Sequence, residues 1–412
     1  MKRVLMISYV FPPYFGSSGN LRVLGFARYL PDHGWEPAVL TAHPRAYSRV
    51  NDRLLEDVPE GLYVRRAFGL DVRRHLSLFG KYPAWLALPD RWATWWLGAV
   101  PTGLSMIRRF RPDVLWSTYP IPTSHLVAAT LSRMTGIPWV ADYRDPMNLS
   151  DAANSELARR VRQRLDRMTV KRASRVVFTT PGARRVYADR YGDVEGEKWA
   201  VVANGFDERH FSRLDIRQKN HRPAGPCRML HSGFLYREER NPMPFFEALA
   251  RLRSEGVISA DRLQVRLRAS GNEDFYRERL RSLGIEDMVE LAESIPYDEA
   301  LREMAEADIL LLFQGRSCNQ QIPAKLYEYV RIGKPILALA DPQGDTGALV
   351  SGDELGEVLD IDDVDAIASG LVRILDDWES GRLGSVPVDR ARKYSRRARA
   401  AELASLLDSL VR

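Results

Sequence analysis

The chain has 412 residues, enough for two or three domains, and its 45% hydrophobic and 28% charged residues exclude a disordered, collagen-like or coiled-coil protein. Two cysteines, Cys227 and Cys318, are too few for a disulfide framework or a cysteine-based zinc site, which favours a reducing compartment. The net charge of +6 is uneven, because residues 1–206 carry 30 Lys and Arg against 18 Asp and Glu, whereas residues 207–412 carry 30 against 36. We therefore expect any anionic surface to meet the N-terminal half.

The first half of the chain alternates short apolar runs with amphipathic stretches. Its first run ends at Val10 and is followed by Pro12 and Pro13 without a small-residue cleavage site, so it is interpreted as a buried strand rather than a signal peptide. The pattern predicts strands at 4–10, 36–41, 112–116, 138–142, 174–179 and 199–203, and helices at 20–31, 124–133 and 156–172. This alternation is typical of a parallel sheet covered by helices.

A polar segment rich in Pro and Gly, residues 219–226, interrupts the pattern and is typical of a domain linker. The alternation then restarts. We predict strands at 228–233, 263–269, 289–291, 309–313 and 335–340, helices at 244–254, 275–283, 297–305, 323–331 and 363–377, and a last helix at 391–411. Two doubly wound α/β domains are the simplest interpretation, and ligands bind such folds at the carboxyl edge of the strands.

Four motifs fall at predicted strand ends. In the first, residues 11–20, Gly16 and Gly19 let the backbone approach a ligand, and the following helix N-terminus offers N–H groups to a phosphate. It is neither a dinucleotide fingerprint nor a Walker loop, and an ordinary strand-to-helix turn explains it equally well.

The second motif is Asp142-Tyr-Arg144-Asp145-Pro, directly after a predicted strand. It indicates a substrate clamp, and the alternative is an Arg–Asp ion pair that fixes a loop. The third contains Arg237 and Arg240, whose guanidinium groups can bind a diphosphate in bidentate fashion, unless they form a solvated charged turn.

The fourth motif, residues 322–336, is the most specific. Pro323 fits a helix start and Gly333 fits its C-cap. Glu328 then lies in the middle of a helix whose N-terminus faces a phosphate, and its carboxylate can accept hydrogen bonds from both hydroxyls of a ribose.

Together these motifs, with Asn204-Gly-Phe-Asp207, resemble the GT-B glycosyltransferases, in particular the retaining family-4 type of bacterial polysaccharide synthesis. The resemblance covers the whole chain. It implies an α/β fold of two doubly wound Rossmann-like domains facing each other across a cleft. Residues 1–206 would bind the acceptor, residues 207–390 would bind the nucleotide-sugar, and a C-terminal helix within 391–412 would cross back onto the first domain.

The resemblance also implies roles for individual residues. Glu328 would bind the ribose, Arg237 and Arg240 the diphosphate, and Gly271 with residues 295–297 would lie near the base. The predicted donor-binding residues are Gly19, Arg237, Arg240, Gly271, Ile295, Tyr297, Gln320, Ala324, Lys325, Leu326 and Glu328.

The chain departs from the family at two positions. Gln320 stands eight positions before Glu328, where the family has a glutamate near the donor sugar, and Arg144 stands where it often has a sugar-contacting histidine. The predicted catalytic residues are Asp142, Arg144, Arg240 and Lys325. Their cations, with the helix N-terminus, would neutralise the leaving group without metal, and the seven histidines show no ligand spacing. Retention would then need no protein nucleophile, because the departing phosphate oxygen assists the acceptor.

Two features favour a membrane partner. Residues 85–96 hold four of the nine tryptophans, and residues 156–175 hold eight Arg or Lys and two acids, with Leu157, Val161, Leu165 and Met168 in one stripe. Aromatic anchors beside a basic amphipathic helix are typical of binding to anionic lipid, although a Trp core and a solvated Arg face explain them too. The uncharged stretch 92–107 is too short to span a bilayer, which needs about 20 residues.

We therefore expect a cytoplasmic enzyme, peripheral at the inner face of the plasma membrane. It would move a hexose from a UDP- or GDP-linked donor to a lipid-linked or glycan acceptor, and nucleic acid is not an expected partner. Two alternatives share the fold: a nucleotide-sugar 2-epimerase, and a non-catalytic partner subunit.

Overall fold

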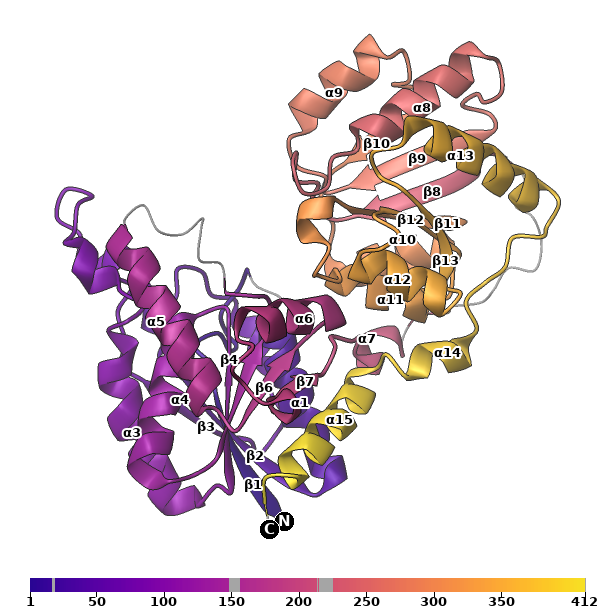
Figure 1. Ribbon diagram of the computed structural model, residues 1–412. Helices are drawn as coiled ribbons and strands as arrows, with labels where there is room; N and C mark the ends of the chain where they lie inside the picture. The colour runs from indigo at the N-terminus through magenta and orange to yellow at the C-terminus, as the bar shows by residue number, and fades with distance from the viewer. Residues whose placement is uncertain (17–18, 148–155, 213, 215–224, 412) are drawn as a thin grey trace. The chain divides into compact units, whose positions relative to one another are not determined.

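The computed structural model describes residues 1–16, 19–147, 156–212, 214 and 225–411 (Figure 1). It divides into two compact units, one formed by Met1–Asn204 with Arg396–Arg412 and the other by Gly205–Ser395. Ser17 and Ser18 of the first glycine motif lie outside the described residues, and so do positions 219–224 of the predicted linker.

The first unit is built on a seven-stranded sheet in the order β3-β2-β1-β4-β5-β6-β7, with every neighbouring pair parallel. Its strands are β1 (Lys2–Ile7), β2 (Trp35–Ala42), β3 (Tyr63–Ala67), β4 (Val114–Thr118), β5 (Trp139–Tyr143), β6 (Arg175–Phe178) and β7 (Trp199–Val201). Its helices are α1 (Gly19–Tyr29), α2 (Val72–His75), α3 (Trp95–Phe110), α4 (Pro122–Thr135), α5 (Glu156–Arg172), α6 (Pro181–Arg190) and α15 (Arg396–Asp408).

Helices cover both faces of this sheet, because its strands place alternate apolar side chains on opposite sides. Leu5 and Ile7 of β1 belong to the core formed with α3, α4 and α6, whereas Val4 and Met6 belong to the core formed with α1 and α15. A strand buried on both faces appears in the sequence as a continuous apolar run, which is why the central strands were predictable.

The last helix, α15, packs beside α1 on the first unit (Figure 1). Two side chains near the start of the chain hold its end. The ammonium of Lys2 lies 2.8 Å from a carboxylate oxygen of Asp408, and the indole N–H of Trp35 donates to the same oxygen at 2.9 Å. The chain therefore finishes in the unit where it begins, as the fold class predicted.

The second unit is built on a six-stranded sheet in the order β10-β9-β8-β11-β12-β13, again parallel throughout. Its strands are β8 (Cys227–Ser232), β9 (Leu263–Arg268), β10 (Val289–Ala292), β11 (Ile309–Gln314), β12 (Ile336–Ala340) and β13 (Gly356–Leu359). Its helices are α7 (Glu208–Phe211), α8 (Met243–Ser254), α9 (Glu273–Ser282), α10 (Tyr297–Glu306), α11 (Ala324–Ile332), α12 (Asp345–Gly352), α13 (Val364–Glu379) and α14 (Val388–Arg392).

Both sheets are doubly wound, and in each the strand order reverses between two adjacent central strands. The reversal lies between β1 and β4 in the first unit and between β8 and β11 in the second. The loops that leave two such strands diverge at the carboxyl edge and open a crevice there, which is where this fold class binds ligands. The fold therefore directs attention to the loops after β1, β4 and β5, and to those after β8 and β11.

The stretch 92–107 was predicted to lack a spanning length, and its apolar character has a packing explanation. It contributes most of α3, whose Trp95, Ala99 and Met106 are buried in the core of the first unit. The prediction had not recognised this stretch as a helix, because Gly98, Pro101 and Gly103 interrupt its apolar pattern. No helix among the described residues combines the length and the hydropathy needed to cross a bilayer.

Candidate functional site

The Asp142 motif lies at the carboxyl edge of the first sheet, where Asp142 forms a buried ion pair with Arg22 of α1. The two guanidinium nitrogens Nε and Nη2 donate to the two carboxylate oxygens at 3.0 and 2.6 Å. Thr118, at the end of β4, donates its hydroxyl to the same carboxylate at 2.8 Å, and Asp142 has no exposed surface. An Arg–Asp ion pair is thus present here, as in the alternative that the sequence left open, but its arginine comes from α1 rather than from the motif itself.

Arg22 connects three parts of the first unit through this pair. Its Nη1 and Nη2 also donate to the carbonyl oxygens of Ala203 and Val202, at 2.9 and 2.8 Å. These carbonyls belong to the segment that follows β7, so one guanidinium joins α1, the end of β5 and the end of the sheet. A buried charge is stable only when it is paired and hydrogen-bonded, and both conditions hold here.

Arg144 and Asp145 follow Asp142 and are only partly buried. Burial lowers the pKa of the Arg144 guanidinium, an effect that Asp145 opposes, and burial raises the pKa of the Asp145 carboxyl, an effect that Arg144 opposes. Thr179 donates its hydroxyl to the carbonyl oxygen of Arg144 at 2.6 Å and so holds the loop against the end of β6.

In the second unit the loops after β8 and β11 meet at the point where the strand order reverses. The amide N–H of Gly315 donates to the carbonyl oxygen of Glu239 at 2.6 Å, which ties the two loops together. Ser232, the last residue of β8, donates its amide N–H to the phenol oxygen of Tyr329 in α11 at 3.1 Å. The third and fourth motifs, about 90 residues apart in sequence, are therefore neighbours in the fold.

Lys325, in the first turn of α11, lies at the centre of this region. Its ammonium is 3.1 Å from Nε2 of His231, whose Nδ1 is 3.0 Å from the carbonyl oxygen of Leu311. That carbonyl can only accept a hydrogen bond, so Nδ1 carries the imidazole proton and Nε2 accepts from Lys325. The lysine is thus held by a neutral histidine rather than by a carboxylate.

The charge state of Lys325 is sensitive to its surroundings. Burial, together with the nearby positive charge of Arg240, lowers the pKa of the lysine to about 7, although Glu328 acts in the opposite direction. Burial, with the charge of Lys325, also lowers the pKa of His231 well below its usual range, so this histidine stays neutral. Lys325 and Arg240 place two positive charges near the N-terminus of α11, with only Glu328 to offset them. A bound anion would therefore reduce the repulsion between the two charges.

Glu328 is partly buried on α11, and its carboxylate accepts a hydrogen bond from the phenol of Tyr297 at 2.6 Å. The ring of Tyr297 also lies edge-on to the ring of His210, with 5.2 Å between the centroids. Two of the predicted donor-binding residues, one at the start of α10 and the other in the middle of α11, are therefore brought into direct contact.

Aromatic rings line the loop after β8. The ring of Phe234 covers Gly271, where a Cβ atom would lie 2.0 Å from the ring, and it packs on Tyr236 at 4.8 Å between centroids. The guanidinium of Arg240 lies over Tyr236, and that of Arg237 lies over Phe275 of α9, 3.9 Å from its centroid. Arg240 therefore faces the Lys325 region, whereas Arg237 turns toward α9.

The remaining predicted donor-binding residues differ in how far they are exposed to solvent. Leu326 is fully buried and belongs to the packed side of α11, whereas Ala324 and Gln320 are exposed and Ile295 is partly exposed. Gly19 is the first residue of α1 and is buried. Sequence reasoning missed His231, Phe234 and Tyr236, because an isolated histidine in a strand and two aromatic residues in a loop carry no spacing that distinguishes them from core residues.

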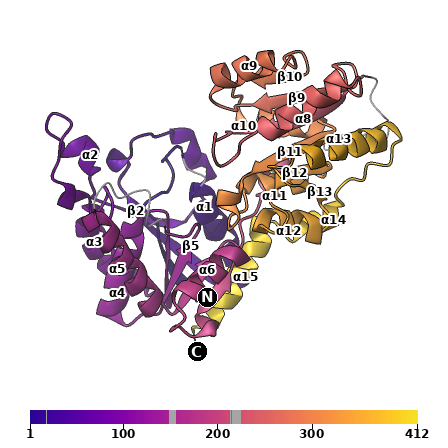
Figure 2. The ribbon, with the colours of Figure 1, turned by 45° about the horizontal axis from the view of Figure 1, so that its top comes forward.

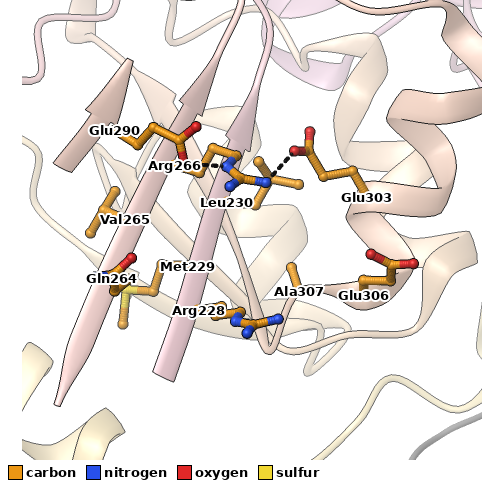
Figure 3. Close-up of a pocket in the computed structure, with 10 residues that line it drawn as sticks. All are labelled: Arg228, Met229, Leu230, Gln264, Val265, Arg266, Glu290, Glu303, Glu306 and Ala307. Carbon is orange, nitrogen blue, oxygen red and sulfur yellow. Dashed lines mark hydrogen bonds and ion pairs between the residues drawn. The ribbon is translucent and has the colours of Figure 1, made fainter. Parts of the chain in front are cut away.

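A cavity of about 260 Å³ lies elsewhere on the second unit, between α10 and the face of the sheet (Figure 3). The strand residues that line it are 228–230 of β8, 264–266 of β9 and Glu290 of β10, so they precede the carboxyl ends of these strands. Three of its charged side chains pair with each other, since Arg266 lies 2.7 Å from Glu290 and 2.8 Å from Glu303. We therefore do not assign the donor to this cavity. The described residues also contain no group of three or more His, Cys, Asp or Glu that could hold a metal ion.

Comparison with known proteins agrees with this division. A family model described as a glycosyl transferase 4-like domain matches residues 19–205, and one described as glycosyl transferases group 1 matches residues 212–399. The D-inositol 3-phosphate glycosyltransferase of Corynebacterium glutamicum (strain R) is 26% identical over 313 residues, which cover 72% of this chain and 68% of that protein.

Solved structures share the fold over the whole length. The sucrose-phosphate synthase of Thermosynechococcus elongatus is 16% identical with a TM-score of 0.67, covering 100% of this chain and 99% of that one. HepE of Anabaena, in complex with UDP-glucose, is 17% identical with a TM-score of 0.65, covering 99% of this chain and 100% of that one. With two doubly wound parallel sheets and both domain matches, the chain belongs to the GT-B glycosyltransferases of the family-4 type.

Proposed function

We propose that the protein transfers a hexose, with retention of configuration, from a UDP- or GDP-linked donor to a glycan or lipid-linked acceptor. The observation that carries the proposal is the cluster at the strand reversal of the second unit. There Lys325, the start of α11 and Glu328 lie next to the loop that carries Arg240. Support for the donor class comes from HepE, which shares the fold and binds UDP-glucose.

The region around the start of α11 offers the diphosphate both backbone N–H groups and charged side chains. No side chain caps the helix at Pro323 in the described structure, so the N–H groups of Ala324 and Lys325 are available to phosphate oxygens. The Lys325 ammonium and the Arg240 guanidinium add full charges. Stabilising the charge that develops on the departing diphosphate lowers the barrier to transfer, and these groups do so without a metal in this proposal.

Glu328 binds the ribose in this proposal. Its carboxylate already accepts one hydroxyl group, that of Tyr297, and the two hydroxyls of a ribose offer the same kind of donor. Gly271 and Ile295 line the approach to the base, and Phe234 supplies an aromatic face over Gly271. Gln320, exposed in the loop before α11, is assigned to the donor sugar.

The first unit contributes the acceptor side in this proposal. Arg144 and Asp145 contact the reacting sugar or the acceptor, and Asp142 positions them through its ion pair with Arg22. Because the leaving phosphate oxygen assists the acceptor hydroxyl, no nucleophile from the protein is assigned. We further propose that the enzyme acts in the cytoplasm, at the inner face of the plasma membrane.

Calorimetric titration with UDP, GDP and ADP tests the donor site. One nucleotide is expected to bind in the micromolar range, and Glu328→Ala is expected to weaken it about 100-fold, equivalent to about 2.7 kcal/mol. Glu278→Ala, at an exposed glutamate on α9, is the matched control and should bind like the wild type. If no nucleotide binds the wild type, the non-catalytic alternative replaces this proposal, and donor turnover without any acceptor would favour an epimerase.

Gly233→Ala tests whether the Lys325 ammonium must keep its position. A Cβ atom at Gly233 would lie 2.6 Å from Nζ of Lys325, and the backbone φ of +124° already disfavours any side chain. We expect nucleotide affinity to fall about tenfold or more, equivalent to about 1.4 kcal/mol. Gly256→Ala is the control for backbone strain alone, since its φ is +71° and no atom lies within 4 Å of the added Cβ. Equal losses in both variants would contradict this role for Lys325.

A further inference from the structure

We propose that the first unit inserts an apolar hairpin tip, formed by Leu78 and Phe79, together with Trp85 six positions later in the chain, into the surface of an anionic lipid membrane. The inference deepens the membrane partner named under the proposed function. We refer to residues 76–85, which hold these three side chains, as the tip segment. Figure 2 shows the chain around α2 standing out from the body of the first unit.

Three large apolar side chains within the ten residues of the tip segment are strongly exposed. Phe79 is 95% exposed, Leu78 73% and Trp85 66%. Apolar residues gathered in this way mark a surface that another apolar phase covers. Protein segments that lie in a membrane interface typically bury Trp, Phe and Leu side chains there.

The backbone holds the apolar pair at the end of a tight hairpin. The amide N–H of Leu78 donates to the carbonyl oxygen of Lys81 at 2.8 Å, and the amide N–H of Lys81 donates to the carbonyl oxygen of Leu78 at 3.0 Å. The two residues between them have positive φ, +50° for Phe79 and +76° for Gly80, as in a type I′ turn. Asn, Asp or Gly normally occupies the first of these positions, so a phenylalanine there is unfavourable for folding and points to a use at the surface.

The charges around the tip segment fit a negatively charged membrane. Residues 72–89 contain Arg73, Arg74 and Lys81 and no Asp or Glu. The preceding acid, Asp71, is buried, and its carboxylate accepts from the amide of Arg73 at the start of α2. A positive segment with an apolar tip gains both electrostatic attraction and apolar burial at an anionic lipid surface.

The basic helix α5 contacts the chain shortly after the tip segment. The Nε of Arg162 donates to the carbonyl of Pro89, four residues beyond that segment, at 3.0 Å. On its inner side, Asp166 accepts hydrogen bonds from the phenols of Tyr143, Tyr187 and Tyr191 at 2.8, 3.0 and 2.7 Å. On its outer side α5 exposes Arg159, Arg160, Arg164 and Arg167, and this side keeps a net positive charge although Glu156 pairs with Arg159 and Arg160.

The aromatic and apolar residues proposed to meet the membrane differ from those that the sequence indicated. Of the four tryptophans at 85–96, Trp95 is fully buried, and Trp92 and Trp96 pack against the core, so Trp85 alone is strongly exposed. The predicted apolar stripe of α5 is also divided, since Leu165 is buried whereas Leu157 is 53% exposed. Leu78 and Phe79, which the sequence did not single out, are the most exposed apolar side chains of the segment.

Vesicle co-sedimentation of the full chain tests the proposal. Wild-type protein is expected to bind vesicles of phosphatidylglycerol and phosphatidylcholine, and to bind pure phosphatidylcholine weakly. The double variant Leu78→Ser, Phe79→Ser is expected to lose affinity about tenfold or more for the anionic vesicles. Met134→Ser is the matched control, because Met134 is 59% exposed in the last turn of α4 and should not affect binding.

A second readout distinguishes insertion from simple charge attraction. Lipids with brominated acyl chains should quench part of the tryptophan fluorescence, and Trp85→Phe should remove that quenched part. Unchanged binding of the double variant, or quenching that persists in Trp85→Phe, would overturn the proposal. The proposal would also be overturned if the wild-type protein bound neither vesicle type, or if it self-associated through the tip segment. Nucleotide titration of the double variant should match the wild type, so failure here is separable from failure of the donor site.

Discussion

Asp142→Ala is expected to lower the free energy of unfolding of the first unit by about 3–5 kcal/mol, because it leaves the buried Arg22 guanidinium without its carboxylate. The loss involves more than one contact. Both carboxylate oxygens accept from Arg22, and Thr118 loses its acceptor as well. Since Arg22 also donates to two carbonyls after β7, the change should loosen the edge of the sheet that carries Arg144.

Urea unfolding followed by tryptophan fluorescence measures this effect in the full chain. Eight of the nine tryptophans lie in residues 1–206, so the signal reports almost entirely on the first unit. The partly buried neighbour is the control, since Asp145→Ala leaves the Arg22 pair intact. An Arg22→Met, Asp142→Leu double variant should recover part of the stability, because it removes both buried charges together. Wild-type stability with lost transferase activity in Asp142→Ala would instead assign Asp142 a direct part in the chemistry.

Nucleotide binding is expected to weaken by about tenfold per pH unit above pH 7, because the bound diphosphate requires a protonated Lys325. The direction of this change in affinity follows from the pKa of about 7 that burial gives the lysine in the free protein. Below that pH the ammonium is already charged, so its contribution to affinity is constant. Above it, each binding event must take up a proton, and a diphosphate raises the pKa of the lysine that it contacts.

Calorimetric titration with the nucleotide that binds best, between pH 7 and pH 9, measures this slope. The terminal phosphate of a nucleoside diphosphate, with a pKa of about 6, is already ionised over that range. His231, whose ring nitrogen contacts the Lys325 ammonium, does not supply the slope, because burial keeps this histidine neutral. Lys325→Arg should bind without this pH dependence, whereas Lys325→Ala should bind about 100-fold more weakly and also lose it. A slope that persists in Lys325→Ala would exclude the lysine as its source.

The sequence by itself determined the fold class because the central strands are buried on both faces. Runs such as Val4–Ile7 and Ile309–Phe313 must be apolar at every position, and such runs can be recognised in the sequence without any tertiary information. The two edge strands β3 and β13 were missed for the opposite reason, although the other two edge strands were predicted. β3 carries Arg65 and Arg66, and β13 begins with Gly356 and Glu357, so neither presents a continuous apolar run. The short helices α6 and α12 were missed because their apolar periodicity is weak.

What only the tertiary structure decided is which motif residues meet. The sequence placed Asp142 and Arg144 side by side in one motif, but the ion pair of Asp142 is with Arg22, 120 positions away. The two arginines of the third motif also separate, because Arg240 turns toward Lys325 and Arg237 stacks on Phe275. Partners of this kind depend on strand order and loop path, which no local pattern encodes.

The same distinction holds for the surface. Composition correctly indicated a basic first half rich in tryptophan, but apolar residues serve cores and membranes equally, and sequence alone cannot separate the two uses. Packing separates them: Trp95 enters the core, whereas Phe79 stays 95% exposed on a hairpin whose turn geometry the chain order does not reveal. The sequence thus determined the sheets and the chemistry available at their edges, and tertiary packing decided which of those groups are buried supports and which remain free to meet a ligand.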